Sequence, residues 1–313
     1  MKKEMYWAYL IHLSSNMWAD PGAKTRYATY SDHLLCDDNV WREVVDFLPE
    51  QGFNTLLIDV GDAIQYESHP EISIKGAWSK DKLKKELDRL RSIGLKPLPK
   101  LNFSTGHDTW LGDYAHMVSS KPYYQVCADL IQEVAELFDY PELFHLGMDE
   151  EDLRHQQNYR YCCIRQGDLW WEDLYRLFDV CEKVGVRPWI WADYVRNHRD
   201  EFLEKMPKSA MLSNWEYRRF ERLPDGTYDN TRYNDYVILD KAGFDQIPTG
   251  STCFGVPQNM ENTMQLGIED LNPDLLKGYM TAPWFFTTPA DIHMLKHDAL
   301  QFGLAKKKMY PEE

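Results

Sequence analysis

The stretch FHLGMDEE, residues 144–151, is an apolar run that ends in adjacent carboxylates near the middle of the chain. Its first residues are typical of a buried β-strand, so the run predicts a strand that delivers Asp149 and Glu150 to a pocket. The loops that follow parallel strands build the active sites of β/α folds, which makes both acids candidate catalytic residues. A solvated acidic loop is the alternative interpretation of the same residues.

A repeated unit surrounds this stretch. A charged amphipathic segment, a glycine and a β-rich apolar run follow one another at Gly52, Gly94, Gly185 and Gly243. Glycine at the end of a helix can adopt the left-handed conformation that terminates the helix and turns the chain into a strand. Each copy therefore predicts a helix-to-strand junction.

The complete pattern predicts eight strands that alternate with eight helices. The strands are expected at residues 6–13, 53–59, 95–101, 143–148, 186–191, 210–215, 244–248 and 277–283. The helices are expected at residues 40–50, 80–92, 123–138, 170–184, 199–205, 233–242, 262–270 and 289–302. Eight such units indicate the α/β class and a single (β/α)8 TIM barrel over residues 1–313. An open doubly wound sheet is the alternative, but no glycine-rich phosphate loop follows the first strand.

The net charge and the aromatic content of the chain limit the kinds of partner that it can bind. The chain has 313 residues and a formal net charge of −15, with no basic run, which argues against nucleic acid or an anionic membrane surface as a partner. Eleven Trp and nineteen Tyr are abundant, and their flat faces either fill a core or stack on sugar rings. Six cysteines without a CxxC pair indicate reduced thiols.

The N-terminal residues resemble an export signal only superficially. The apolar run from Met5 to Leu13 contains His12 and has no small-residue cleavage site, so it is better interpreted as the first strand. No apolar run reaches the roughly 20 residues that a membrane span needs. We expect a cytoplasmic protein, with an exported form that lost its leader as the alternative.

Aromatic and acidic residues recur at the predicted strand ends, which would all face one mouth of the barrel. They are Asp149 and Glu150 after the fourth strand, Trp191 and Asp193 at the fifth, Asn214, Trp215 and Glu216 at the sixth, and Trp284 at the eighth. Three tryptophans and a carboxylate pair at equivalent positions indicate a pocket. The histidines form no HExxH pair and no Walker loop occurs, so neither a metal nor a cofactor is expected.

Adjacent carboxylates repel each other, so we expect one of the pair to keep its proton to higher pH. The cleavage of a sugar linkage needs this division between a proton donor and a charged group. Two further hypotheses remain open. Glu150 could work with Asp193 or Glu216 as the second carboxylate, or the barrel could bind carbohydrate without cleaving it.

The segment His145–Glu150 resembles the His-x-Gly-Gly-Asp-Glu motif of family 20 glycoside hydrolases, the β-N-acetylhexosaminidases. Other pieces occur in the order typical of that family, and the similarity covers roughly residues 53–284. These pieces are Phe53-Asn54, Asp62, Pro70, Gly76-Ala77-Trp78-Ser79, Gly94-Leu95, Gly106-His107 and the later tryptophans.

The resemblance implies a retaining mechanism in which the substrate's own 2-acetamido oxygen attacks the anomeric carbon. Glu150 would be the general acid and later the general base, and Asp149 would orient the acetamide. Trp191, Trp215 and Trp284 would enclose the acetamide and the sugar ring. His107 and Asp62 match positions beside the pocket or at its edge.

Departures from the family pattern concern recognition of the other hydroxyl groups. Met148 replaces the second glycine of the motif, and Ser14-Ser15-Asn16 stands where the family has an arginine. Trp284-Phe285-Phe286 lacks the family's acid, and residues 249–252 show no match to its tyrosine. We therefore expect an N-acetylated or related sugar as the substrate, bound with altered hydroxyl contacts.

Overall fold

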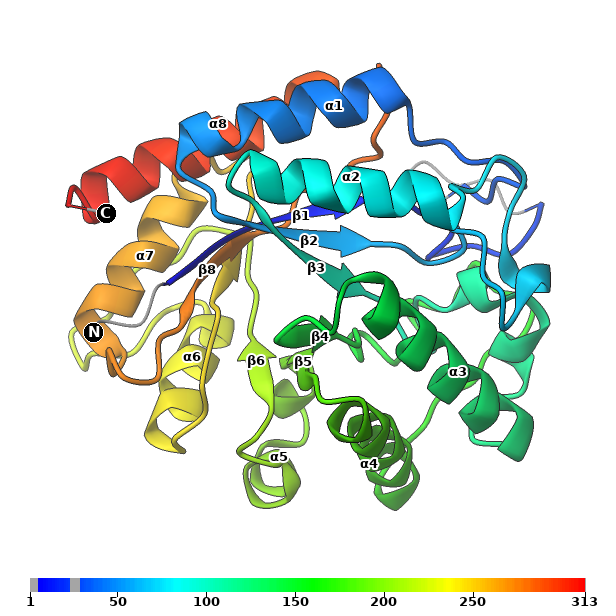
Figure 1. The fold of residues 1–313 in the computed structure, drawn as a ribbon. Coiled ribbons are helices and arrows are strands. Elements are labelled where there is room, and N and C mark those ends of the chain that lie inside the picture. Colours follow the sequence, from blue (N-terminus) through cyan, green and yellow to red (C-terminus); the bar gives the residue numbers. More distant parts are fainter. Residues whose placement is uncertain (1–4, 23–28, 313) are drawn as a thin grey trace.

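The computed structural model describes residues 5–22 and 29–312. Parallel strands form a central sheet, and the arrowheads of the first three point toward long loops at the right of Figure 1. The strands are β1 (Tyr6–His12), β2 (Thr55–Asp59), β3 (Lys96–Lys100), β4 (Leu143–His145), β5 (Arg187–Trp191), β6 (Met211–Ser213), β7 (Thr249–Gly250) and β8 (Gly278–Thr281).

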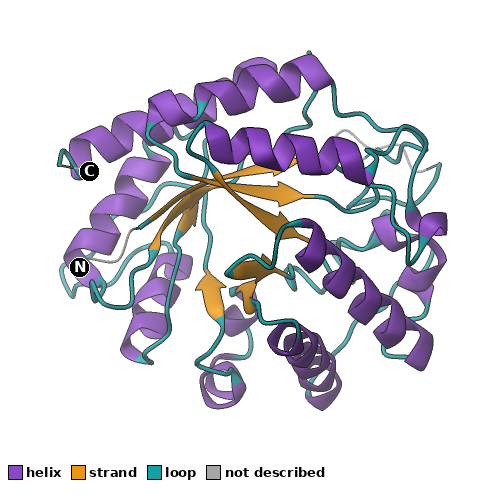
Figure 2. Cartoon of the chain, in the orientation of Figure 1, coloured by secondary structure: helices purple, strands orange, loops and turns teal. Residues whose placement is uncertain are grey.

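Helices surround the strands, as Figure 2 shows. Within the described residues they are α1 (Asp38–Phe47), α2 (Lys80–Ser92), α3 (Lys121–Leu137), α4 (Asp168–Lys183), α5 (Arg199–Lys205), α6 (Thr231–Lys241), α7 (Asn259–Asp270) and α8 (Ile292–Met309). Each strand is followed by one of these helices, which is the arrangement of a (β/α)8 barrel. None of the helices in this part of the chain is both long and apolar enough to cross a membrane.

The barrel closes between β6 and β7. The sheet runs in the order β6-β5-β4-β3-β2-β1-β8-β7, and parallel bridges join Leu212 to Gln246 and Trp215 to Thr249. The amide of Thr249 donates to the carbonyl of Asn214 at 3.0 Å. These contacts confirm the predicted barrel and exclude the open doubly wound sheet.

Most element boundaries differ from the predictions by a few residues, and three of the differences have a clear physical cause. The fourth strand ends at His145 because Gly147 and Met148 both have positive φ angles, which a strand cannot accommodate. The seventh strand was expected at residues 244–248, but regular pairing occurs only at Thr249–Gly250, just after that range, since Pro248 has no N–H to donate. The last helix continues past Gly303, where a Cβ would lie 2.9 Å from the carbonyl oxygen of Gln51.

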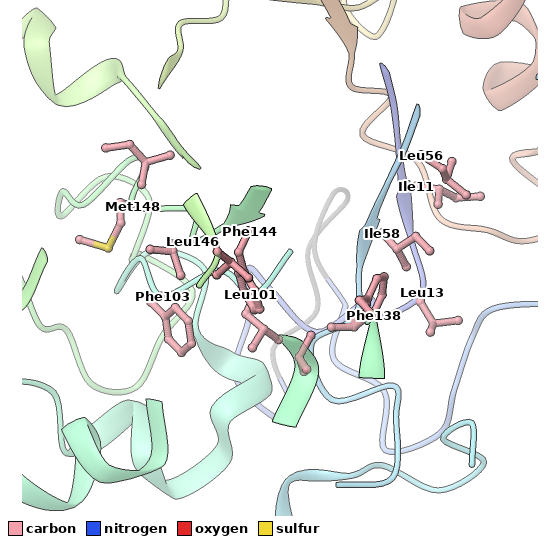
Figure 3. Close-up of a cluster of buried hydrophobic side chains, with 14 of the residues drawn as sticks. Ile11, Leu13, Leu56, Ile58, Leu101, Phe103, Phe138, Phe144, Leu146 and Met148 are labelled. Carbon is pink, nitrogen blue, oxygen red and sulfur yellow. The ribbon is translucent and has the colours of Figure 1, made fainter. Parts of the chain in front are cut away.

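Alternate side chains of each strand enter two separate cores. In β1, Ala8 and Leu10 face the barrel interior, while Tyr9 and Ile11 pack in the layer between strands and helices. Figure 3 shows this outer layer beside β4, where Met148 belongs to the same cluster. The residues that lead into the predicted catalytic pair are therefore fixed by packing.

The inner layer below the barrel mouth carries charge. His12, Asp59, Lys100 and His145 are neighbours in register on β1 to β4. The Lys100 ammonium forms a buried ion pair with Asp59, and His12 Nδ1 lies 3.3 Å from the same carboxylate. Burial opposes ionisation of Asp59, but Lys100 and His12 outweigh it and lower its pKa to about 2.

Replacing Lys100 with Met should destabilise the fold by about 3–5 kcal/mol, because it leaves Asp59 as an uncompensated buried charge. Urea unfolding at neutral pH measures the change in the free energy of unfolding. The double variant Asp59→Leu/Lys100→Met is the control. It should recover part of the loss, and a double variant as unstable as the sum of its parts would contradict this interpretation.

Candidate active site

The chain makes a tight turn after β4 that aims the two acids into the barrel mouth. Gly147 has a φ of 74°, and a Cβ there would lie 1.8 Å from Asn102 Oδ1. Met148 keeps a positive φ of 72° although it is not glycine, and its side chain is buried in the outer core. The departure from the family motif at Met148 therefore places no side chain in the pocket.

Gly147→Ala should disrupt the site, because the new methyl group would displace the Asn102 side chain that donates to Asp149. The positive φ adds a backbone cost of order 1 kcal/mol or more for any residue with a Cβ. We expect a lower melting temperature together with loss of ligand binding. Gly185→Ala is a suitable control, since its φ is also positive but nothing lies within 4 Å of the added Cβ.

One imidazole lies between the two acids. His107 Nδ1 is 3.4 Å from Asp149 Oδ1, and His107 Nε2 is 3.5 Å from Glu150 Oε2. Asn102 Nδ2 donates to Asp149 Oδ1 at 2.9 Å, and the Ser104 hydroxyl donates to the Asp149 carbonyl. The structure thus brings together the predicted residues Asp149, Glu150 and His107.

The charges in this cluster favour a proton on the histidine. Burial disfavours the charged imidazolium of His107, but Asp149 and Glu150 outweigh it and raise its pKa to about 10. Burial alone would raise the pKa of Glu150, yet hydrogen bonds from His107 and His155 lower it well below its usual range. The expectation that repulsion leaves a proton on one carboxyl is wrong for Glu150, because two imidazole groups compensate the charge.

This cluster predicts a pH dependence of stability. The pKa of His107 rises from 6.5 to about 10 on folding, so its contribution is complete below pH 6.5 and is lost as the pH rises toward 10. His107→Gln should therefore give a flatter curve of unfolding free energy against pH over this range. Parallel curves for the two proteins in urea titrations would contradict the assignment of the proton to His107.

Asp193 supports both the acid and the aromatic wall. Its Oδ2 accepts the backbone N–H of Glu150 at 3.0 Å, and its Oδ1 accepts the indole N–H of Trp215 at 3.4 Å. Burial raises the pKa of Asp193 to about 6, although Arg196 opposes the rise. The guanidinium carbon of Arg196 lies 4.1 Å from the Trp215 ring centroid, so the wall has a fixed orientation.

The three predicted tryptophans form one connected wall. The rings of Trp191 and Trp284 are 6.0 Å apart, and the Trp284 indole N–H donates to the Tyr217 hydroxyl at 2.9 Å. Tyr217 stacks on Trp215 at 5.3 Å. Trp18 joins the wall from the loop after β1, with its ring 5.9 Å from Trp284.

Sequence reasoning missed Tyr217 and Trp18. Tyr217 lies two residues beyond Trp215 at a predicted strand end, which was a usable signal. Trp18 lies within a long loop, where no periodic pattern indicates which way a side chain points. Its ring lies 6.1 Å from that of His107, which places it beside the cluster of His107, Asp149 and Glu150.

Asp62 binds the polar residues that replace the family's arginine. The Ser14 hydroxyl and the Asn16 amide each donate to its carboxylate at 2.7 Å. Burial raises the pKa of Asp62 to about 7, although these two bonds oppose the rise. Within the described residues, Asp62 makes no hydrogen bond or ion pair with Asp149 or Glu150, so it forms a separate polar cluster after β1 and β2.

Glu216 stabilises the loop after β6, in which it lies. Its Oε1 accepts the backbone N–H groups of Tyr217 and Arg218, both at 2.9 Å, and its Oε2 lies 3.4 Å from Arg232 Nη1. The carboxylate is buried. These contacts make Glu216 a support for the Trp215–Tyr217 segment, and they do not join it to Glu150.

A buried ion pair anchors the loop that follows the acids. Arg165 pairs with Glu151 and lies 3.0 Å from Asp173, and its Nη2 donates to the Phe103 carbonyl at 2.8 Å. Glu151, the third acid of the run, is thus bound to a cation inside the protein. Its position shows that only the first two acids of the run face the cluster around His107.

The residues His107, Asp149 and Glu150 also form the one group of potential metal ligands found among the described residues. One ligand atom from each lies within 4.8 Å of the others. The two imidazole nitrogens face different carboxylates, however, at distances of 3.4 and 3.5 Å, so a doubly protonated ring would pair with both. The donor geometry therefore fits a protonated histidine.

The fold and the site define a (β/α)8 barrel whose fourth strand presents two acids to a wall of tryptophans. No protein-family model matches this chain, and no curated protein matches it either. Solved structures do resemble it. The Streptomyces plicatus N-acetyl-β-hexosaminidase in complex with Thio-NAglucal superposes with a TM-score of 0.64 at 15% identity, over 96% of this chain and 64% of that chain.

Two other enzymes give the same result. A β-N-acetylhexosaminidase from Bacteroides fragilis has a TM-score of 0.66 at 12% identity, covering 97% of this chain and 65% of that chain. The GH20 exo-β-N-acetylglucosaminidase from Vibrio harveyi, in complex with N-acetylglucosamine, has a TM-score of 0.63 at 13% identity. The superposition covers 98% of this chain and 57% of that chain. The chain therefore shares the fold of family 20 β-N-acetylhexosaminidases, and it spans less than two thirds of the length of these three enzymes.

Proposed function

We propose that this protein is a retaining glycoside hydrolase that cleaves N-acetylated or related sugars with assistance from the substrate's acetamide group. The observation that carries the proposal is the placement of His107 between Asp149 and Glu150, next to a wall of tryptophans. The shared fold of the hexosaminidases supports it.

In this proposal Asp149 orients the acetamide. Asn102 and His107 hold its Oδ1, so the carboxylate keeps a fixed direction and needs little reorganisation during the reaction. The acetamide oxygen attacks the anomeric carbon while the bond to the leaving oxygen breaks. The negative charge of Asp149 stabilises the cationic ring that forms, since it accepts a hydrogen bond from the acetamide N–H.

Glu150 transfers the proton. It protonates the leaving oxygen in the first step and removes a proton from water in the second, when water opens the cyclic intermediate. Trp191, Trp215 and Trp284 present flat apolar faces to the acetamide and the ring. The Tyr217 hydroxyl accepts from Trp284, so its own proton can be donated to the acetamide oxygen.

Hydroxyl recognition differs from the family pattern in this proposal. The family has an arginine on this side of the mouth. Here the uncharged side chains of Ser14 and Asn16 take its place, and both donate hydrogen bonds to Asp62. Phe286 stands where the family has an acid, and its ring lies 6.5 Å from Trp18. We therefore expect weak selection for the hydroxyls far from the acetamide.

The test compares aryl 2-acetamido-2-deoxy-β-glycosides with aryl β-glycosides that have a 2-hydroxyl group. We expect hydrolysis of the first set alone, release of the β-anomer in NMR spectra, and inhibition by an N-acetylglucosamine thiazoline that mimics the cyclic intermediate. Equal rates on both sets, or release of the α-anomer, would refute acetamide assistance.

A non-catalytic carbohydrate-binding barrel is the second candidate. The observation in its favour is the lowered pKa of Glu150, which keeps this carboxyl ionised in the ligand-free protein. Calorimetry with N-acetylated oligosaccharides, together with a broad panel of glycosides, separates the two functions. Binding without hydrolysis of any glycoside would favour the second candidate.

A further inference from the structure

A second histidine contacts Glu150 from the side opposite His107. His155 lies on the loop after β4, and its Nε2 is 3.2 Å from Glu150 Oε1. Its Nδ1 is 2.8 Å from Asp152 Oδ1, which also accepts the backbone N–H of His155 at 3.0 Å. The three side chains form a line from Asp152 through His155 to Glu150.

The two histidines differ in their access to water. The side chain of His107 is 4% exposed, whereas that of His155 is 30% exposed and that of Asp152 is 55% exposed. His107 therefore has no route for exchanging protons with solvent except through the pocket. His155 connects the same carboxylate to the outer surface of the loop.

The loop around His155 is anchored on both sides. Glu151 forms the buried pair with Arg165 described above. The buried Gln156 side chain donates to the Cys163 carbonyl at 2.6 Å and accepts the Cys163 N–H at 2.7 Å. His155 thus lies between two fixed residues, which sets the direction of its ring toward Glu150.

We propose that His155 and Asp152 form a solvent-facing relay that holds the outer oxygen of Glu150 and exchanges protons between this carboxyl and water. The inference rests on the proposed role of Glu150 as acid and base. His155 is a positioning residue in this scheme, since it acts on the substrate only through Glu150.

The proton balance of the relay is simple. The Nε2–H bond of the His155 imidazolium breaks, an O–H bond forms on Glu150, and Glu150 then gives this proton to the leaving oxygen. When Glu150 later takes a proton from the attacking water, the proton returns to His155 Nε2. Asp152 stays ionised throughout and stabilises the imidazolium.

The charged groups around the His155 imidazole favour its role in proton exchange. The titratable groups that face His155 are Glu150 and Asp152, and Glu150 also faces His107 and Asp193. Burial opposes protonation of His155, but the two carboxylates outweigh it and raise its pKa. The ring can therefore store a proton near neutral pH while remaining accessible to water.

The first test follows the titration of the His155 ring by NMR in the full-length protein. The pKa of His155 should fall in Glu150→Gln and in Asp152→Asn, and it should be unchanged in Glu204→Gln, which alters an exposed glutamate on α5. This measurement needs no substrate. An unchanged His155 titration in Glu150→Gln would overturn the relay, whether or not the protein hydrolyses glycosides.

The second test uses kinetics. His155→Gln should lower kcat by about tenfold, less than the hundredfold or more expected for the general acid itself. Added imidazole should restore part of kcat, and the acidic limb of the pH profile should shift, because a soluble proton carrier replaces the ring. Loss of activity without rescue or shift would overturn the relay. Absence of hydrolysis by the unmodified protein would instead refute the proposed function.

Discussion

Glu150→Gln should lower kcat/KM toward aryl N-acetyl-β-hexosaminides by about a hundredfold to ten-thousandfold, the range typical of a positioned general acid. Glutamine preserves the size of the side chain and can still contact His107 and His155, but it cannot release a proton to the leaving oxygen. Steady-state kinetics with a series of aryl leaving groups measures the effect.

The leaving group decides whether the loss is due to acid catalysis. A nitrophenolate leaves without much protonation, so the variant should retain more activity on this substrate than on an alkyl or sugar glycoside. Glu204→Gln, on the exposed face of α5, is the matched control and should be indistinguishable from the unmodified protein. An equal loss on all leaving groups would argue against Glu150 as the acid.

Asp149→Asn should reduce kcat/KM by about a hundredfold to a thousandfold, because it removes a preorganised charge next to the developing cation. The buried carboxylate is held by Asn102 and His107, so the substitution changes its charge more than its shape. Asp200→Asn on α5 is the exposed control. Binding of the thiazoline mimic should weaken in parallel, since this compound reproduces the cyclic intermediate.

The same variant separates the enzymatic mechanisms. If the acetamide is the nucleophile, Asp149→Asn should impair only substrates with an acetamido group. If a second carboxylate such as Asp193 were the nucleophile, Asp193→Asn would abolish turnover, whereas Asp149→Asn would have a smaller effect. Measuring kcat/KM of both variants, on substrates with a 2-acetamido group and on substrates with a 2-hydroxyl group, distinguishes the two mechanisms.

Local signals in the sequence predicted the elements that carry the site. Glycines at helix ends and the alternation of amphipathic and apolar runs located the barrel, because caps and periodicity depend on near neighbours in the chain. The position of the seventh strand and the length of the last helix were missed. Pro248 and Gly303 owe their roles to hydrogen bonding and close contact with other segments.

The candidate site was predictable only in outline. Asp149, Glu150 and the three predicted tryptophans lie at or just after strand ends, and parallel strands present their carboxyl ends at one mouth. His155 and Trp18 lie within long loops, where no sequence pattern indicates the direction of a side chain, whereas Tyr217 follows a strand end and could have been predicted.

The sequence by itself therefore determined the barrel and the strand that delivers the two acids, since both follow from local patterns repeated along the chain. Only the tertiary structure decided the state of those acids. The loop after β3 brings His107 to Glu150 from a distant part of the sequence, and the folding of the loop after β4 turns His155 back to the same carboxylate. The charges of the two imidazoles lower the pKa of Glu150. A pKa depends on what lies within a few ångströms in space, which no run of residues specifies.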